Sequence, residues 1–184
     1  VDLLNNEAYT QTTVSNGIIS VINIYSYVDS VYVFRLDGKF VRTGAGLIDV
    51  QSELINTAQW REPLLEAKGG VVLSINGQDA FPKRSGTPVI SMMRLIYNIE
   101  TQKEAGLLVV NLSPNVLHTA VQDMTPSGQI CFFDKQGHIL WGDESLQEYF
   151  SPEAVGRGFW WRELGSGAQK RILSCYSAHD SPIV

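Results

Sequence analysis

The chain has 184 residues, 44% of them hydrophobic and 18% charged, with a net charge of −5 and an isoelectric point near 5.1. This composition excludes a disordered chain and predicts one globular domain or two small ones, each with a hydrophobic core. The acidic balance and the absence of a basic patch argue against nucleic acid as a partner.

No stretch reaches the roughly 18 apolar residues that a membrane-spanning helix needs. The sequence also lacks an initiator Met and a signal-peptide pattern. We therefore expect a piece of a longer protein, joined to a membrane only through segments outside this sequence.

The first predicted element is a helix over residues 2–27. Apolar residues recur at intervals of three or four and form one stripe: Val14, Ile18, Val21 or Ile22, Tyr25 and Val28. Gly17 interrupts this pattern, so the helix must gain stability from packing.

Two short strands follow on either side of Asp37-Gly38, a dipeptide that supplies the positive φ of a tight hairpin turn. Residues 50–56 and 57–68 are then predicted as two short helices. The second of these helices ends at Gly69-Gly70, which suits a C-cap.

A strand over residues 71–75 and a polar loop over residues 78–87 come next. Residues 89–99 predict another strand, and after a turn at 101–106 the apolar run at 107–112 predicts a buried strand. Ser113-Pro114 then resembles an N-cap followed by proline at the first helical position.

The second part of the chain repeats this order of elements. Residues 128–143 resemble residues 30–44, with the turn glycines Gly38 and Gly137 at equivalent places. A short helical segment at 144–150 and two strands within 156–176 follow. The sequence thus predicts two copies of one α+β motif.

Catalytic and metal-binding patterns are absent from the sequence. His118, His138 and His179 are isolated, and neither a nucleophile elbow nor a phosphate-binding loop is present. Cys131 and Cys175 lack metal-ligand spacing and are interpreted as small buried residues, with a disulfide between them left open. We expect a non-catalytic chain with no metal or cofactor.

Five residues are candidates for a ligand site. Trp60 and Arg61 lie on or just before a short helix near the sheet, and Met92, Arg94 and Tyr97 lie on a strand. Strand alternation places Met92 and Arg94 on one face and Tyr97 on the other. An aromatic platform with a cation suits a sugar, an amino acid or a carboxylate. Core packing of Trp60 and a surface or ion-paired role for Arg94 are the alternatives.

The pattern resembles the extracellular double Cache sensors of bacterial transmembrane receptors, and most closely the YesM-like sensor histidine kinases of Gram-positive bacteria. The segments that carry the resemblance are VDSVYVFRLDGKFV, QWREPLLEAKGG, ISMMRLIYN, GLLVVNLSPNVL and QICFFDKQGHILW. It covers nearly the whole chain.

The resemblance implies an α+β fold in which a long N-terminal helix precedes two PAS-like (Cache) domains, each an antiparallel sheet flanked by helices. Residues 1–28 would be a signalling helix rising from the membrane. Residues 29–112 would be the membrane-distal domain, and residues 113–184 a smaller membrane-proximal domain that lacks its closing strand. Ligand would bind the distal domain, between its sheet and a covering segment that contains Trp60 and Arg61, with Arg94 opposite.

Members of this family that bind amino acids carry an Arg shortly before the Trp, an aromatic residue directly after it and a downstream Asp. Here the residues before Trp60 are Thr57, Ala58 and Gln59, and Arg61 follows it. The sequence comparison therefore favours a sugar or a carboxylate over an amino acid.

The expected function is the extracytoplasmic ligand-sensing region of a membrane-bound signal-transduction receptor, a two-component sensor histidine kinase in the first instance. Chemotaxis or cyclic-dinucleotide receptors use the same type of sensor, and a ligand-free interaction or dimerisation module is a further alternative. A soluble cytoplasmic PAS or GAF-like module is a third. The ligand, the output domain, the direction of signalling and homodimer formation in the full-length receptor are left open.

Overall fold

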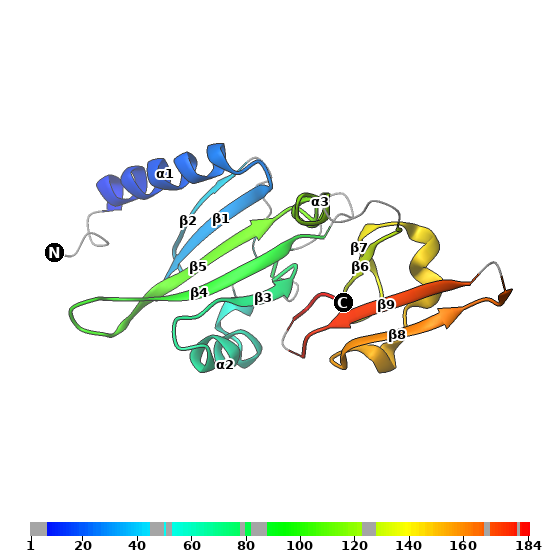
Figure 1. Ribbon diagram of the computed structural model, residues 1–184. Helices are drawn as coiled ribbons and strands as arrows, with labels where there is room; N and C mark the ends of the chain where they lie inside the picture. The colour runs from blue at the N-terminus through cyan, green and yellow to red at the C-terminus, as the bar shows by residue number, and fades with distance from the viewer. Residues whose placement is uncertain are drawn as a thin grey trace. The chain divides into compact units, whose positions relative to one another are not determined.

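The computed structural model describes residues 7–44, 50, 53–77, 80–81, 88–122, 128–167, 170–179 and 181–184 (Figure 1). The chain divides into two compact units, Val1–Val116 and Leu117–Val184. The division lies inside a short helix, a few residues after the boundary at 112–113 that the sequence suggested. Each unit is described by itself below.

Unit 1 contains one antiparallel sheet of five strands in the order β2-β1-β5-β4-β3. Its helix α1 packs along β1 and β2, and the short helix α2 lies beside β3 and β4 (Figure 1). The elements are α1 (Glu7–Ile24), β1 (Val28–Arg35), β2 (Phe40–Gly44), the 3-10 helix η1 (Leu54–Asn56), α2 (Ala58–Glu66), β3 (Val72–Ile75), β4 (Ile90–Tyr97), β5 (Glu104–Leu112) and α3 (Asn115–Val121), which crosses into unit 2.

The helix α1 lies within the residues predicted to be helical, and residues 1–6 are outside the described residues. The hairpin predicted at Asp37-Gly38 is confirmed: Gly38 has φ 82°, and Asp37 Oδ1 accepts a hydrogen bond from the backbone N–H of Lys39. Of the helix predicted at 50–56, only the 3-10 turn η1 is present among the described residues.

The turn between β4 and β5 is tighter than the sequence predicted. Asn98 Oδ1 accepts hydrogen bonds from the backbone N–H groups of Glu100 and Thr101, and Gln102 adopts a positive φ of 55°. This local side-chain turn reverses the chain within five residues. β5 therefore begins at Glu104, inside the range that had been interpreted as the turn.

One face of the sheet carries the hydrophobic core of unit 1. Alternation along the strands directs the side chains of Tyr32, Met93, Leu95, Leu107 and Val109 to the same face. The same core includes Ile55 of η1, Trp60 and Leu64 of α2, and Phe81 from the segment between β3 and β4; all of these residues are at most 6% exposed.

The described residues of unit 2 form two separate two-stranded sheets, where the sequence predicted one sheet flanked by helices. Each strand pairs with its neighbour in sequence across a short connection, and the C-terminal residues add a short bridge at the end of β6, where the backbone groups of Phe133 and Val184 hydrogen-bond to each other. The elements are β6 (Cys131–Phe133), β7 (Ile139–Gly142), the 3-10 helices η2 (Glu144–Tyr149) and η3 (Pro152–Ala154), β8 (Gly158–Leu164) and β9 (Arg171–Ser177).

The two cysteines, left as a possible disulfide by the sequence, are free thiols in the structure. Cys131 lies on β6 and Cys175 on β9. Burial raises the pKa of the Cys131 thiol to about 11 and also raises the pKa of Cys175. Both thiols are therefore protonated and unreactive near neutral pH.

Within the described part of the chain, no helix has the length and apolar character needed to cross a bilayer.

Gly77 and Gly38 provide a matched test of core packing in unit 1. Both have a positive φ, but a Cβ at Gly77 would lie 2.5 Å from the Phe81 ring, whereas a Cβ at Gly38 would meet nothing within 4 Å. We expect Gly38→Ala to cost about 1 kcal/mol of unfolding free energy from backbone strain. Gly77→Ala should cost roughly 2–4 kcal/mol, because overpacking adds to that strain.

Urea denaturation would measure both variants as shifts of the midpoint at a constant slope. Equal losses for the two variants would show that Phe81 does not pack against Gly77 as the structure has it.

Candidate functional site

The candidate site lies in unit 1, between the core face of the sheet and α2. Thr57 precedes α2, and its carbonyl accepts hydrogen bonds from the backbone N–H groups of Trp60 and Arg61. This first turn directs the Trp60 side chain into the core, where it is 1% exposed.

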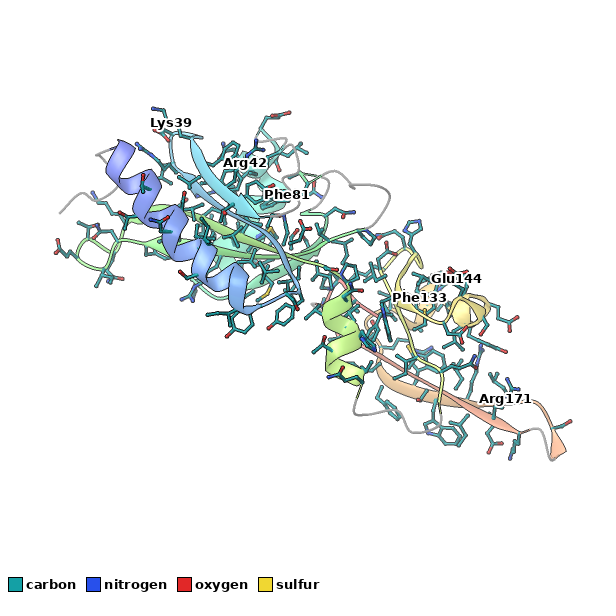
Figure 2. The ribbon with its side chains drawn as sticks, turned by 90° about the horizontal axis from the view of Figure 1, so that it is seen from above. Lys39, Arg42, Phe81, Phe133, Glu144 and Arg171 are labelled. Atoms are coloured by element: carbon teal, nitrogen blue, oxygen red, sulfur yellow. The ribbon has the colours of Figure 1, made fainter. Side chains whose placement is uncertain are left out.

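Aromatic rings surround the Trp60 side chain. Its ring centroid lies 6.2 Å from that of Phe81, which in turn lies 4.9 Å from the ring of Tyr32 on β1. Figure 2 shows Phe81 among the packed side chains of unit 1. These tilted geometries are those that aromatic pairs prefer.

The indole N–H of Trp60 is buried and has no hydrogen-bond acceptor among the described residues. A buried donor without a partner costs on the order of 1–3 kcal/mol, and native cores seldom contain one. The core around Trp60 therefore leaves one strong polar group unused, which a bound acceptor would satisfy.

A row of four small polar side chains crosses the core face near this indole. The strand register sets Ser30 opposite Asn111, Asn111 opposite Ser91, and Ser91 opposite Ser74, and each of these side chains is at most 4% exposed. Ser91 Oγ donates to Asn111 Oδ1 over 2.7 Å, and Asn111 Nδ2 donates to Ser30 Oγ over 3.2 Å.

The row ends at Ser74, on the strand that leads into the turn packed against Trp60. Ser74 lies on β3, and three residues later Gly77 packs so closely to Trp60 that a Cβ there would lie 2.9 Å from Cζ2 of the indole. Among the described residues, the Ser74 hydroxyl has only a weak contact, with Met93 Sδ at 4.0 Å. A neutral hydroxyl and an unpartnered indole N–H thus lie at the same end of β3.

Arg61, the predicted cation of the site, is already paired. Its Nη1 and Nη2 atoms bind the two carboxylate oxygens of Glu104 on β5, at 2.5 and 2.6 Å. Donating to the Glu104 carboxylate raises the pKa of the Arg61 guanidinium above its ordinary value. This bidentate pair fastens α2 to the start of β5 and leaves the guanidinium less available to a ligand.

The structure does not bring the five predicted residues together. Tyr97 packs against the core on the side that also carries Trp60 and Arg61. Met92 and Arg94 point to the opposite face, because they alternate with the core residues Met93 and Leu95, and Arg94 is exposed. A ligand role for Trp60, Arg61 and Tyr97 stays a prediction, but Met92 and Arg94 lie on the other side of the sheet from Trp60.

The polar row was missed by the sequence analysis, although the sequence carries a signal for it. Three of its members, Asn111, Ser91 and Ser74, are each a single small polar residue within an apolar run, as in LLVVNL around Asn111 and VISMM around Ser91. Only the strand register shows that the four residues are neighbours.

No family model matches the sequence, and no curated protein sequence matches it. Solved structures with the same fold do exist. The ligand-binding domain of the Campylobacter jejuni chemoreceptor Tlp3 in complex with L-norvaline is 16% identical, with a TM-score of 0.59 over 92% of this chain and 68% of that chain.

Two further structures extend the likeness. The ligand-binding domain of the Pseudomonas fluorescens chemoreceptor CtaA, in complex with L-isoleucine, is 13% identical, with a TM-score of 0.55 over 92% of this chain and 69% of that one. The extracellular domain of the putative histidine kinase rpHK1S-Z16 is 14% identical, with a TM-score of 0.52 over 89% of this chain and 71% of that one. The chain has the fold of bacterial receptor sensory domains.

The comparisons correct one expectation. The sequence analysis favoured a sugar or a carboxylate over an amino acid, and this preference is wrong, because the structures of this fold hold L-norvaline and L-isoleucine. The preference rested on the few residues on either side of Trp60. A ligand site is built from residues that the fold brings together from several strands, so these neighbours alone do not determine the ligand.

The pairing of Arg61 with Glu104 can be tested by a double-mutant cycle. We expect Arg61→Gln and Glu104→Gln each to destabilise unit 1, and the double variant to be little worse than either single variant. The coupling should be about 1 kcal/mol, the upper end for partly exposed pairs, and should fall in high salt.

The Arg35–Asp37 pair is a suitable control in the same unit, because its Nη2–Oδ2 contact is longer, at 3.0 Å, and its carboxylate is 44% exposed. Its cycle should give a smaller coupling. Additive effects of Arg61→Gln and Glu104→Gln would contradict the pairing that fastens α2 to β5.

Proposed function

We propose that the chain is the extracytoplasmic ligand-sensing part of a bacterial transmembrane receptor, and that unit 1 binds an L-amino acid with an apolar side chain. The observation that carries this proposal is the buried Trp60 N–H, which has no acceptor among the described residues, in a core whose sheet face also carries a buried row of neutral polar groups. The ligands of the Tlp3 and CtaA structures support the choice of ligand class.

The chemistry of the site suits such a ligand. A carboxylate oxygen would accept the hydrogen bond that the Trp60 indole offers, and the Ser74 hydroxyl would be a further neutral partner. Leu64, Met93 and Phe81 would surround an aliphatic side chain with apolar surface. In this proposal an ammonium group would be bound by neutral oxygens.

The signal would pass through the strand ends of unit 1. A ligand held between α2 and the sheet would favour one position of α2, and so shift the population between two conformations. The backbone N–H of Ser113, after β5, donates to the carbonyl of Tyr27, before β1. A change in the sheet would thus reach the chain segments before β1 and after β5 together.

A histidine kinase of the YesM-like type stays our prediction for the output, with a chemotaxis receptor as the alternative. The likeness to the extracellular domain of rpHK1S-Z16 supports the first, and the likeness to Tlp3 and CtaA the second. In either case we propose that this chain acts by binding and that catalysis belongs to another part of the receptor.

Calorimetric titration with L-isoleucine, L-valine and L-norvaline tests the ligand class. We expect binding of at least one of them, and much weaker binding of isovalerate and isoamylamine, which lack the ammonium and the carboxylate respectively. At 100 times the dissociation constant, a ligand should raise the unfolding free energy by about 2.7 kcal/mol.

Trp60→Phe tests the site itself, because it keeps an aromatic ring and removes the N–H. We expect about a tenfold loss of affinity, the value of one hydrogen bond. The stability that the ligand-free protein loses to the smaller ring should be partly offset by removal of the unpartnered N–H. Trp160→Phe is the matched control, because the indole N–H of the half-buried Trp160 in unit 2 is also buried and has no hydrogen-bond acceptor among the described residues.

Unchanged affinity in Trp60→Phe would place the ligand elsewhere. Failure of the whole amino-acid panel to bind would overturn the ligand class and favour a module that works through protein contacts.

A further inference from the structure

The hairpin of β8 and β9 in unit 2 has one exposed apolar face. Its register pairs Phe159 with Tyr176, Trp161 with Ser174, and Glu163 with Ile172. Strand alternation puts all six side chains on the same face. The four large apolar ones are strongly exposed, with Phe159 at 65%, Trp161 at 58%, Ile172 at 72% and Tyr176 at 66%.

This hairpin has almost no core of its own. Of the 14 residues in the two strands, only Ser177 is buried. A two-stranded sheet is marginally stable by itself in water and needs a packed face to persist. The exposed face therefore has both the composition of an interface and a structural need for a partner.

We propose that a second copy of this chain packs on this face, with the two hairpins face to face around a two-fold axis. The pair Trp161 and Ser174 is the middle pair of the seven in the hairpin register and would lie near that axis. The proposal concerns unit 2 and does not depend on the ligand of unit 1.

The apolar area is close to what a stable dimer needs. Fully exposed side chains of these types present on the order of 150–250 Å² each, so the four together offer about 450 Å² per copy. Two copies would bury about 900 Å² from these side chains alone, near the roughly 1,000 Å² that a specific interface requires. The backbone, Ser174 and Glu163 on the same face would add to this area.

The charges on the face also fit a second copy. Its one charged residue, Glu163, forms an ion pair with Lys170, with Nζ and Oε2 2.5 Å apart. The face is therefore close to neutral, and two copies can meet on it without like-charge repulsion. A chain of net charge −5 with a neutral apolar face is a poorer match for an anionic lipid surface.

Sedimentation equilibrium of the purified chain tests the proposal. We expect a concentration-dependent mass that rises from 20.4 kDa to twice that value, with a dissociation constant in the micromolar range. Ile172→Lys should raise the dissociation constant at least tenfold. Ile99→Lys is the matched control, because Ile99 is 88% exposed on unit 1 and its replacement should leave the dimer unchanged.

Disulfide trapping locates the contact. Ser174→Cys, in a background with Cys131→Ser and Cys175→Ser, should form a covalent dimer on mild oxidation. Arg171→Cys in the same background should not, because Arg171 is exposed on the opposite face near the far end of the hairpin (Figure 2).

Three outcomes would overturn the proposal. They are a mass of 20.4 kDa at every concentration, a dimer that Ile172→Lys does not weaken and Ser174→Cys does not cross-link, and a monomer that binds neutral phosphatidylcholine vesicles through this face. The last result would assign the face to lipid. Circular dichroism of each variant would separate a lost contact from a lost fold.

Discussion

The central strand β5 is the constraint on which unit 1 depends. It pairs with β1 on one side and β4 on the other, so its alternation decides which side chains of all three strands share the core face. Leu107 and Val109 pair with residues of both neighbouring strands to make the apolar part of that face. Asn111, two residues further along, makes the polar part. The register of β5 thus determines both the apolar core and the polar row at the candidate site.

A compromise between stability and binding follows from this arrangement. Trp60 contributes a large apolar surface to the core but leaves its N–H without a partner among the described residues. Such a group lowers the stability of the empty protein and increases the gain from a ligand that can accept its hydrogen bond. Arg61, the next residue, offsets part of this cost by fastening α2 to Glu104. The two neighbours therefore differ: Arg61 holds the helix in place, and Trp60 is the residue that we propose binds the ligand.

Features that depend on residues close together in the sequence could be predicted, and features that depend on distant residues could not. The Asp37-Gly38 hairpin depends on two residues and was predicted, and so was the division of Met92, Arg94 and Tyr97 between two strand faces. Which of those faces α2 would cover depends on the whole sheet and could not be derived. The Arg61–Glu104 pair joins residues 43 apart, and the polar row joins residues from four strands. No local pattern encodes such pairings.

The two units differ in how much of their own apolar surface they bury. Unit 1 buries a continuous core under α2, and its polar row is hydrogen-bonded internally. Unit 2 has only Leu117, Phe133, Leu140 and Ala154 as buried apolar residues in its described part, while β8 and β9 expose four large ones. Unit 1 also has exposed apolar side chains, among them Ile24 and Ile99, but the four in unit 2 lie together on one face of a hairpin. Because the free energy of association grows with the contiguous apolar area that a partner covers, our proposal places the partner on unit 2. In a receptor of this kind, ligand binding in one unit and association through the other would be separate functions, each open to change without loss of the other.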